Sequence, residues 1–358
     1  MNIGYFISSH GFGHASRACA VMDTLGKMAY INFYIFTATP EWFFRNSLSV
    51  PFELIRIQSD VGLVQATPFE EDIEKTIISL EEFLPFSDLQ NEPITQLVSQ
   101  KKLDLILCDI SPIGLWVAER LDIPSVLIEN FTWDWIHEHY LESYPGLEKF
   151  ISIFREIYES PTIHFTCEPF CKLSEKSIIV PPVFRVSRTE KEKIRKQLGV
   201  REGEKLILVT MGGIPIEYVE ENRRLYLDDY KFLMPVNDVR NIQKTNNIIY
   251  LPHDHPFFHP DLVNASDLVI GKLGYSTVAE VYSLDKPFLF IGRRNFRESK
   301  ILKKFVLEHL ISEEVELATI FSSQTIDKSI NLISKTRIKT AHKNGADEIA
   351  HFVLKYFG

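Results

Sequence analysis

Short apolar runs alternate with amphipathic segments along the chain, and this alternation predicts its architecture. In the first half, apolar or β-branched runs are separated by segments whose apolar residues recur at helical spacing. The runs near Leu105–Cys108 and Ser125–Glu129 are continuously apolar, as in strands that are covered on both faces. Strands that alternate with helices form a parallel sheet with helices on both sides. We therefore predict a doubly wound α/β domain.

The elements expected in this first half are bounded by changes in the same pattern. The expected strands are Asn2–Ser8, Ile31–Thr37, Phe52–Ile57, Leu105–Cys108, Ser125–Glu129, Thr162–Phe165 and Ser177–Val180. The expected helices are Ala15–Leu25, Glu70–Phe83, Thr95–Lys101, Leu115–Leu121 and Leu147–Glu159.

Two adjacent prolines, Pro181 and Pro182, interrupt the alternation and predict a linker, because proline ends a strand and stiffens the chain. The charged segment Arg188–Glu204 follows and predicts a surface helix that ends near Gly199. A second α/β series then begins. Its expected strands are Leu206–Met211, Phe232–Met234, Ile248–Leu251, Leu268–Gly271 and Phe288–Ile291.

The pattern thus predicts two similar open-sheet domains, residues 1–182 and residues 183–340. A last amphipathic helix is expected over about Gly345–Tyr356. Its place in the fold stays open at this point, and one arrangement packs the end of the chain, residues 341–358, back on the first domain. The length of 358 residues fits two domains.

Composition narrows the class of protein without changing this picture. The chain is 45% hydrophobic and 24% charged, as in ordinary soluble globular proteins. Its formal net charge of -9 argues against a nucleic-acid partner. No apolar run reaches membrane-spanning length, and the apolar run at the N-terminus is too short for a signal peptide. We expect a cytoplasmic protein without integral membrane association, and leave peripheral membrane contact open.

The cysteines do not predict a metal site. The chain has four, Cys19, Cys108, Cys167 and Cys171, and no two of them form a C-x-x-C pair. A structural zinc site needs more ligands at closer spacing. We expect reduced thiols that pack as small apolar side chains.

The segment His10–Arg17 predicts a functional turn between the first strand and its helix. Gly11 and Gly13 let the backbone bend sharply there. Ser16 stands where the dinucleotide-binding fingerprint would carry its third glycine, so that fingerprint is absent. His14 falls near the start of the helix, at the end of the sheet where open α/β folds bind ligands. A base or substrate contact is favoured for His14 over a purely structural hydrogen bond.

The second domain carries glycine turns of its own. Gly212 and Gly213 follow its first strand, and the segment Gly271–Glu280 runs from a later strand into a helix. Backbone amides at a helix N-terminus bind phosphate, and Gly274, Ser276 and Thr277 lie at this one. Glu280 follows one turn later, where a carboxylate can accept hydrogen bonds from the vicinal hydroxyls of a sugar.

Several of these segments together resemble the GT-B glycosyltransferases, near the plant UDP-sugar transferases and the peptidoglycan GlcNAc transferase, and more closely the glycosyltransferase-like half of L-arabinokinases. The resemblance is carried by His10–Arg17, Asp60–Gln65, Glu129–Ile136, Ser187–Val200 and Gly271–Glu280. It implies two Rossmann-like domains that face a central cleft, with the acceptor on the first domain and a nucleotide sugar on the second. The kinase half of arabinokinase has no counterpart here, so the resemblance implies no sugar kinase activity.

The resemblance also implies roles for single residues. His14 corresponds to the base that deprotonates the acceptor, and Asp109 to the aspartate that orients it. On the donor side, the resemblance implies that Arg185 contacts the pyrophosphate and that Glu280 holds the ribose. It assigns the diphosphate to Gly274, Ser276 and Thr277, and the donor sugar to Arg297 and Glu298. We add the Gly212–Gly213 turn to this side. Ser299 stands where the plant enzymes have glutamine, which leaves the sugar and donor use open.

Other features keep two interpretations. Asp109 either pairs with His14 or caps the helix that follows it. His253, His255 and His259 resemble metal ligands, but the prolines among them favour a base-binding or structural loop. On the acceptor side we place His10, Gly11, Gly13 and Trp133, and the aromatic side chain is equally suited to a sugar stack or to the core. We expect Arg297 to face the cleft.

The sequence therefore predicts an inverting, metal-independent glycosyltransferase of hexosyl or N-acetylhexosaminyl type. It would use a nucleotide-diphosphate sugar, expected to be UDP-linked, an acceptor hydroxyl and no cofactor. A histidine base and a phosphate-binding helix N-terminus suit this chemistry. Two alternatives stay open, a non-catalytic sugar-nucleotide-binding or regulatory module, and a nucleotide-sugar epimerase or hydrolase on the same fold.

Overall fold

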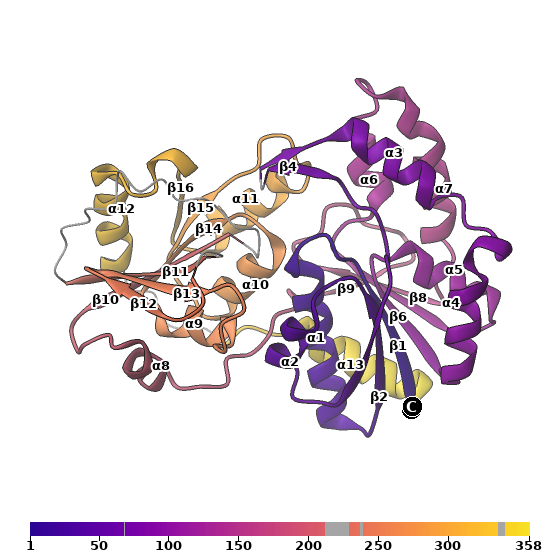
Figure 1. Ribbon diagram of the computed structural model, residues 1–358, viewed down its shortest axis with the longest axis horizontal. Helices are drawn as coiled ribbons and strands as arrows, with labels where there is room; N and C mark the ends of the chain where they lie inside the picture. The colour runs from indigo at the N-terminus through magenta and orange to yellow at the C-terminus, as the bar shows by residue number, and fades with distance from the viewer. Residues whose placement is uncertain (68, 212–228, 237–238, 336–340) are drawn as a thin grey trace. The chain divides into compact units, whose positions relative to one another are not determined.

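The chain forms two compact units, each built around its own β-sheet. The computed structural model describes residues 1–358 except 68, 212–228, 237–238 and 336–340 (Figure 1). Unit 1 comprises Met1–Phe184, Asn295–Glu298 and Lys343–Gly358, and unit 2 comprises Arg185–Arg294 and Ser299–His342. The predicted α/β class with parallel sheets is confirmed in both units.

Unit 1 contains a seven-stranded sheet in the order β3-β2-β1-β6-β7-β8-β9. All of its neighbouring strands run parallel. Its strands are β1 (Asn2–Ile7), β2 (Asn32–Thr37), β3 (Phe52–Arg56), β6 (Leu105–Asp109), β7 (Ser125–Glu129), β8 (Ile163–Cys167) and β9 (Ile178–Val180). A separate antiparallel pair joins β4 (Gln65–Thr67) and β5 (Glu70–Glu71).

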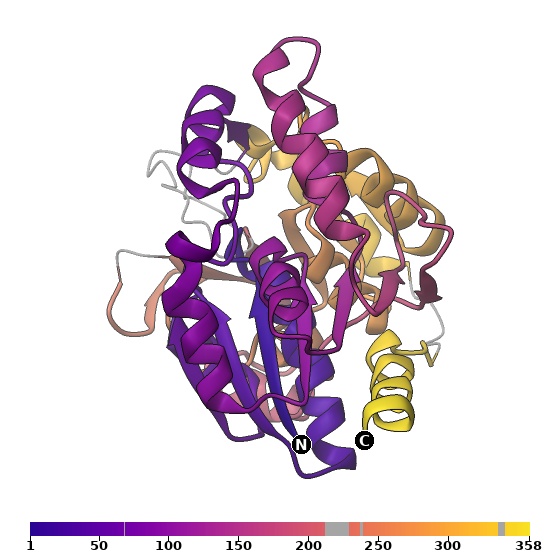
Figure 2. The same ribbon diagram turned by 90° about the vertical axis from the view of Figure 1, so that its right-hand side faces the viewer.

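Helices cover both faces of this sheet. They are α1 (Phe12–Met28), α2 (Glu41–Ser47), α3 (Ile73–Phe83), α4 (Asp88–Lys101), α5 (Pro112–Arg120), α6 (Trp133–Glu138), α7 (Glu148–Tyr158) and α13 (Gly345–Phe357), with a 3-10 turn at Pro145–Leu147. Helices α1 and α13 pack together on one side, and α4, α5 and α7 lie on the other (Figures 1 and 2). Helix α5 lies very close to the strands, since a Cβ at Gly114 would meet Phe6 at 2.6 Å.

Unit 2 repeats the design with a seven-stranded sheet in the order β12-β13-β11-β10-β14-β15-β16, in which only β12 is antiparallel to its neighbour. The strands are β10 (Lys205–Thr210), β11 (Tyr230–Val236), β12 (Gln243–Thr245), β13 (Ile248–Pro252), β14 (Leu268–Lys272), β15 (Phe288–Ile291) and β16 (Ser312–Glu314). The helices are α8 (Lys191–Leu198), α9 (His259–Ala265), α10 (Tyr275–Ser283), α11 (Ser299–His309) and α12 (Ser323–Ser334), with a 3-10 turn at Leu317–Thr319.

The division between the units departs in detail from the pattern of the sequence. The first boundary lies after Phe184 rather than after Pro182. The segment Asn295–Glu298, which falls within the expected second domain, belongs to unit 1 by its contacts. Helix α13 also belongs to unit 1, where it packs on α1 and beside β9. Among its residues, Ala346, Ile349, Ala350 and Val353 are fully buried.

Candidate active site

The first candidate cluster lies where the strand order of unit 1 reverses. Strands β1 and β6 are neighbours there, and Ile7 pairs with Asp109 at their carboxyl ends. The chain turns after β1 through Gly11, whose φ of 77° is readily adopted only by glycine. Helix α1 starts at Phe12, so His14 lies in its first turn. Such a switch point is where open α/β sheets bind ligands.

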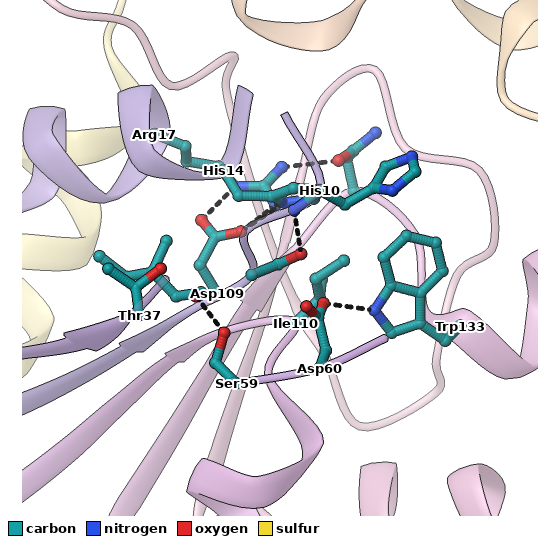
Figure 3. A network of polar contacts seen from close by, with 12 residues as sticks. His10, His14, Arg17, Thr37, Ser59, Asp60, Asp109, Ile110 and Trp133 are labelled. Carbon is teal, nitrogen blue, oxygen red and sulfur yellow. Dashed lines mark hydrogen bonds and ion pairs between the residues drawn. The ribbon is translucent and has the colours of Figure 1, made fainter. Parts of the chain in front are cut away.

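His14 and Asp109 form the predicted pair. His14 Nδ1 lies 2.8 Å from Asp109 Oδ1, and both residues are buried (Figure 3). Burial raises the pKa of Asp109, but Arg17 and His14 outweigh burial and hold that pKa below its ordinary value. The alternative role as a helix cap is not observed, because Ser111 is the N-cap of α5 and makes no side-chain cap bond.

Arg17 binds the same carboxylate. Its Nε donates to Asp109 Oδ2 and its Nη2 to Asp109 Oδ1, both at 2.7 Å (Figure 3). Arg17 stands three residues after His14 on α1, so both side chains lie on one face of the helix. The guanidinium is 1% exposed and the carboxylate 0%, so this ion pair is shielded from water.

The polar contacts continue beyond Arg17 within unit 1. Its Nη1 donates to Asn130 Oδ1 at 2.6 Å, and Asn130 Nδ2 donates to Glu298 Oε1 at 2.7 Å. Asn130 directly follows β7, the next strand of the sheet after β6. Glu298 arrives from the Asn295–Glu298 segment and is itself buried. We call His14, Asp109, Arg17, Asn130 and Glu298 the unit 1 network.

Aromatic side chains line the histidine side of this network. The ring of His14 lies 5.7 Å from that of Phe131 and 6.4 Å from that of Trp133. Trp133 is fully buried and its Nε1 donates to Asp60 Oδ2 at 2.9 Å, so the indole forms part of the core and presents no open face for stacking. Residues 10–13, which include His10, Gly11 and Gly13, are half-buried.

The second cluster occupies the corresponding place in unit 2, where β10 and β14 are neighbours at the reversal of strand order. Glu280 is 1% exposed and binds two basic side chains. Its Oε1 accepts from Arg185 Nε at 2.9 Å, and its Oε2 lies 2.7 Å from His259 Nδ1. Burial raises the pKa of Glu280, but Arg185 and His259 lower it below the ordinary value overall.

Helix α10 begins beside this cluster with an uncapped N-terminus. Gly274 is the N-cap and makes no side-chain cap bond. Ser276 and Thr277 lie in the first turn, where backbone N–H groups lack partners within the helix. Among the described residues, a Cβ at Gly274 would meet no atom within 4 Å. Gly212 and Gly213 lie outside the described residues.

Other expected residues take up internal contacts. Arg297 contacts the Trp135 carbonyl and Glu138 Oε2, the latter at 2.9 Å, and stacks on Trp135, so its guanidinium is bound to α6 of unit 1. His255 is buried, and burial lowers its pKa to about 4. His259 starts α9 and binds Glu280. In the described part of the chain, no three His, Cys, Asp or Glu side chains are grouped to hold a metal ion.

A family model for "Glycosyl transferase family 1" matches residues 1–310 of this chain. The chain belongs to this family. Curated relatives of the chain include L-arabinokinase of Arabidopsis thaliana, 26% identical over 84% of the chain. They also include the UDP-N-acetylglucosamine–N-acetylmuramyl-(pentapeptide) pyrophosphoryl-undecaprenol N-acetylglucosamine transferase of Clostridium botulinum, 25% identical over 51% of the chain. The chain spans 29% and 56% of the lengths of these two relatives.

Solved structures share the fold of the chain over nearly its whole length. The calicheamicin glycosyltransferase CalG4 is 11% identical with a TM-score of 0.59, over 99% of this chain and 97% of its own. Acinetobacter baumannii MurG is 15% identical with a TM-score of 0.54, over 99% of both chains. These likenesses establish the GT-B glycosyltransferase fold. Among the described residues, no helix is both long and apolar enough to span a membrane.

Sequence reasoning missed two members of the candidate site, Arg17 and Asn130. The spacing of His14 and Arg17 by three residues would have placed both on one helix face. Asn130, directly after a fully buried strand, would have been placed at the same sheet edge as Asp109. The contact with Glu298 had no such signal, because Glu298 is 168 residues away from Asn130.

Proposed function

We propose that this chain is an inverting glycosyltransferase that moves a sugar from a UDP-linked donor to an acceptor hydroxyl without a metal. The single observation that carries the proposal is the buried His14–Asp109 pair at the switch point of unit 1. A histidine beside a carboxylate is the arrangement of a general base. Family membership supports sugar transfer.

In the proposed reaction, His14 Nε2 takes the proton of the acceptor hydroxyl. The acceptor oxygen then bonds to the anomeric carbon while the bond from that carbon to the diphosphate oxygen breaks. The bonding electrons leave with the diphosphate, and the configuration at carbon inverts. Asp109 fixes the ring through Nδ1 and stabilises the imidazolium that forms. Nε2 makes no hydrogen bond to any described residue, which suits a base.

The leaving diphosphate is assigned to the N-terminus of α10. The N–H groups of the first turn, which have no acceptor within the helix, and the helix dipole favour negative charge there, and the Ser276 and Thr277 side chains add hydroxyl donors. Negative charge grows on the diphosphate in the transition state, so these groups stabilise that state more than the ground state.

Glu280 is proposed to hold the nucleotide ribose. Its carboxylate is already bound by Arg185 and His259, which fix its orientation and keep it ionised. A carboxylate has more acceptor sites than these contacts fill, so it can still receive ribose hydroxyls. UDP is favoured as the nucleotide because one relative is named for UDP-N-acetylglucosamine. One structural neighbour, Phytolacca americana UGT2, is complexed with UDP-2fluoro-glucose.

Calorimetry with UDP, GDP and dTDP sugars tests the donor side. We expect UDP sugars to bind best, and we expect Glu280→Ala to weaken nucleotide binding about tenfold or more. Glu308→Ala, an exposed change on α11, is the matched control and should bind as the parent does. Absence of binding to every nucleotide sugar would overturn the proposal.

Turnover separates the proposal from its alternatives. With a panel of sugar and lipid-linked acceptors, His14→Ala should lower the rate of transfer about 100-fold or more and leave nucleotide binding unchanged. Binding without turnover in the parent would indicate a sensor. Loss of the sugar to water, or its isomerisation, without any acceptor would indicate a hydrolase or an epimerase.

A further inference from the structure

We propose that Arg17 and Asn130 are positioning residues of the reaction centre, which hold the His14–Asp109 pair and tie it to the Asn295–Glu298 segment. The proposal rests on the proposed function for its kinetic consequences, but the geometry that carries it lies within unit 1. Neither residue is assigned a role by the family resemblance. Both are fully or nearly fully buried, and both make charge-assisted hydrogen bonds.

Arg17 clamps Asp109 in a way that lysine cannot reproduce. Three of its nitrogens are engaged at once, Nε and Nη2 on the two oxygens of Asp109 and Nη1 on Asn130. A planar guanidinium matches a carboxylate with two parallel bonds, whereas an ammonium is a point charge. The clamp therefore fixes the plane of the carboxylate and with it the direction of Oδ1 toward His14.

The clamp also selects the form of the imidazole. Arg17 Nη2 lies 3.4 Å from His14 Nδ1, but its better contact is Asp109 Oδ1 at 2.7 Å. That oxygen, 2.8 Å from Nδ1, can only accept while the carboxylate is ionised. Nδ1 therefore carries the proton, which leaves Nε2 of the neutral ring as an acceptor. This is the tautomer that a base needs.

Asn130 links the clamp to the chain far away in sequence. Arginine only donates and a carboxylate only accepts, so the amide must turn its oxygen to Arg17 and its nitrogen to Glu298. The backbone of Asn130 is held as well, since its carbonyl accepts from Cys171 N at 2.8 Å. The side chain therefore acts as a fixed bridge between two charges.

The Asn295–Glu298 segment is anchored on unit 1 at every residue. The Asn295 carbonyl accepts from Tyr140 Oη at 2.8 Å, and Phe296 is 3% exposed in the hydrophobic core of unit 1. Arg297 is bound to α6, and Glu298 to Asn130. Of the two residues that the resemblance assigns to the donor sugar, Glu298 thus shares one hydrogen-bonded path with the base, whereas Arg297 is bound to α6. A disturbance at Glu298 is expected to reach His14 through Asn130, Arg17 and Asp109.

Arg17→Lys tests the clamp, with Arg45→Lys as the matched control because Arg45 is exposed and pairs only locally with Glu41. Lysine keeps the charge and lowers the risk of misfolding. We expect kcat to fall about 100-fold while the KM for the nucleotide sugar stays within about threefold, since a small displacement of the base costs rate rather than binding. A kcat within about threefold of the parent would overturn the clamp.

A reciprocal exchange tests the bridge. Asn130→Asp sets two carboxylates against each other and should lower kcat about tenfold or more. Adding Glu298→Gln restores a hydrogen bond of reversed direction with the same total charge, and should recover kcat to within about threefold. If Glu298 acts only on the donor, the double variant will instead keep a raised KM and show no recovery, which would overturn the bridge.

Nuclear magnetic resonance of 15N-histidine protein, without any ligand, provides a readout independent of transfer. The His14 signal, assigned by its loss in His14→Gln, should report the Nδ1-protonated tautomer in the parent and in Arg45→Lys, and a mixture in Arg17→Lys. An Nε2-protonated ring in the parent would overturn the inference even if the protein transfers sugar. The expected spectra from a protein that transfers nothing would leave the network intact and reject only the proposed function.

Discussion

Asp109 binds both of the basic side chains that reach it, and this sharing defines the chemistry of the unit 1 network. A carboxylate with no exposed surface is costly unless it is paired and hydrogen-bonded. Arg17 provides the opposite charge and two hydrogen bonds to this carboxylate, so Asp109 can stay ionised without a charge on His14. In the proposed function, His14 then takes the proton of the acceptor hydroxyl during turnover.

Asp109→Asn is expected to harm both folding and activity. The amide cannot accept two hydrogen bonds from Arg17 and another from His14 in the same geometry, and it leaves a buried guanidinium without its counter-charge. We expect the free energy of unfolding to fall by about 3–5 kcal/mol and transfer to fall by about 100-fold or more. Denaturant unfolding and initial rates measure the two effects. Asp327→Asn, exposed on α12, should change neither; unaltered stability in Asp109→Asn would contradict the buried pair.

His137 predicts a loss of stability in acid. Burial lowers its pKa to about 4, while the unfolded chain has the ordinary value of 6.5. The unfolded state therefore binds a proton first as the pH falls, so stability is complete above about pH 6.5 and decreases toward pH 4. The full difference is about 3 kcal/mol. Urea unfolding from pH 7 to pH 4.5 should show a shallower decline in His137→Gln, and an unchanged one in the exposed variant His351→Gln.

How far the site could be predicted differs from residue to residue. His14 lies just beyond the carboxyl end of β1, and Asp109 ends the neighbouring strand β6. The pattern of apolar runs places both residues at the same edge of the sheet, and the family resemblance implies their pairing. Trp133 was open between a stacking surface and the core, and its full burial depends on Asp60 and on neighbours that no local pattern specifies. The engagement of Glu280 by Arg185 likewise depends on packing across 95 residues of sequence.

The two strand-to-helix turns share a plan but differ in their backbone. Gly11 adopts a φ that other residues rarely accept, whereas Gly274 has a φ of -140° that any residue adopts. Glycine at 274 is therefore not required by the backbone. No atom of the described residues lies within 4 Å of the place of its missing Cβ, which suits the proposed diphosphate at α10.

Gly274→Ala should consequently weaken UDP binding with little effect on stability, whereas Gly271→Ala should lower the stability of the fold. Alanine at 274 meets nothing and should lower the free energy of unfolding by less than about 1 kcal/mol, yet weaken UDP binding about tenfold. Alanine at 271 would lie 2.6 Å from the Thr210 carbonyl oxygen of β10, so it should destabilise the sheet by about 1–3 kcal/mol. Thermal unfolding and calorimetry separate the two; full UDP affinity in Gly274→Ala would contradict a diphosphate at α10.

Strands with an apolar pattern were predicted, but several helices were missed, including the amphipathic helices α11 and α12 of unit 2. The strands of both sheets from β1 to β15 correspond to expected runs, apart from β12. Most of them are buried in the sheets, and the partly exposed strands β3 and β9 still carry apolar residues. Strand β12 (Gln243–Thr245) is wholly exposed and polar, and β16 (Ser312–Glu314) is an edge strand, so neither carries a periodic signal. Helices α2, α6 and α9 are only six or seven residues long.

Asn344 fastens the returning end of the chain to unit 1. Its Oδ1 accepts from the N–H groups of Phe184 and Ala346, and its Nδ2 donates to the Phe184 carbonyl at 2.8 Å. It is also the N-cap of α13. Asn344→Ala should therefore lower the free energy of unfolding by about 1–3 kcal/mol and speed hydrogen exchange in α13. Asn331→Ala, exposed on α12, is the control; unaltered exchange in α13 would contradict this anchoring role.

The chain passes between its two units more often than the pattern of elements predicts. An apolar pattern divides a chain into sequential domains, whereas unit 1 also contains Asn295–Glu298 and the returning end Lys343–Gly358. The Asn295–Glu298 segment joins unit 1 because Phe296 enters a core whose members are distant in sequence. Glu298 therefore belongs to unit 1, whereas the next residue, Ser299, belongs to unit 2.

The assignment of acceptor chemistry to unit 1 and nucleotide chemistry to unit 2 can be tested on the intact chain by hydrogen exchange. Bound UDP should slow exchange in the first turn of α10, because those amides would donate to phosphate. It should leave the first turn of α1 unaffected, since that turn is assigned to the acceptor. The same UDP concentration should raise the melting temperature, because a ligand at 100 times its Kd stabilises the folded state by about 2.7 kcal/mol. If UDP instead slowed hydrogen exchange mainly in the first turn of α1, the assignment would be reversed, and the turn that carries His14 would be the phosphate site.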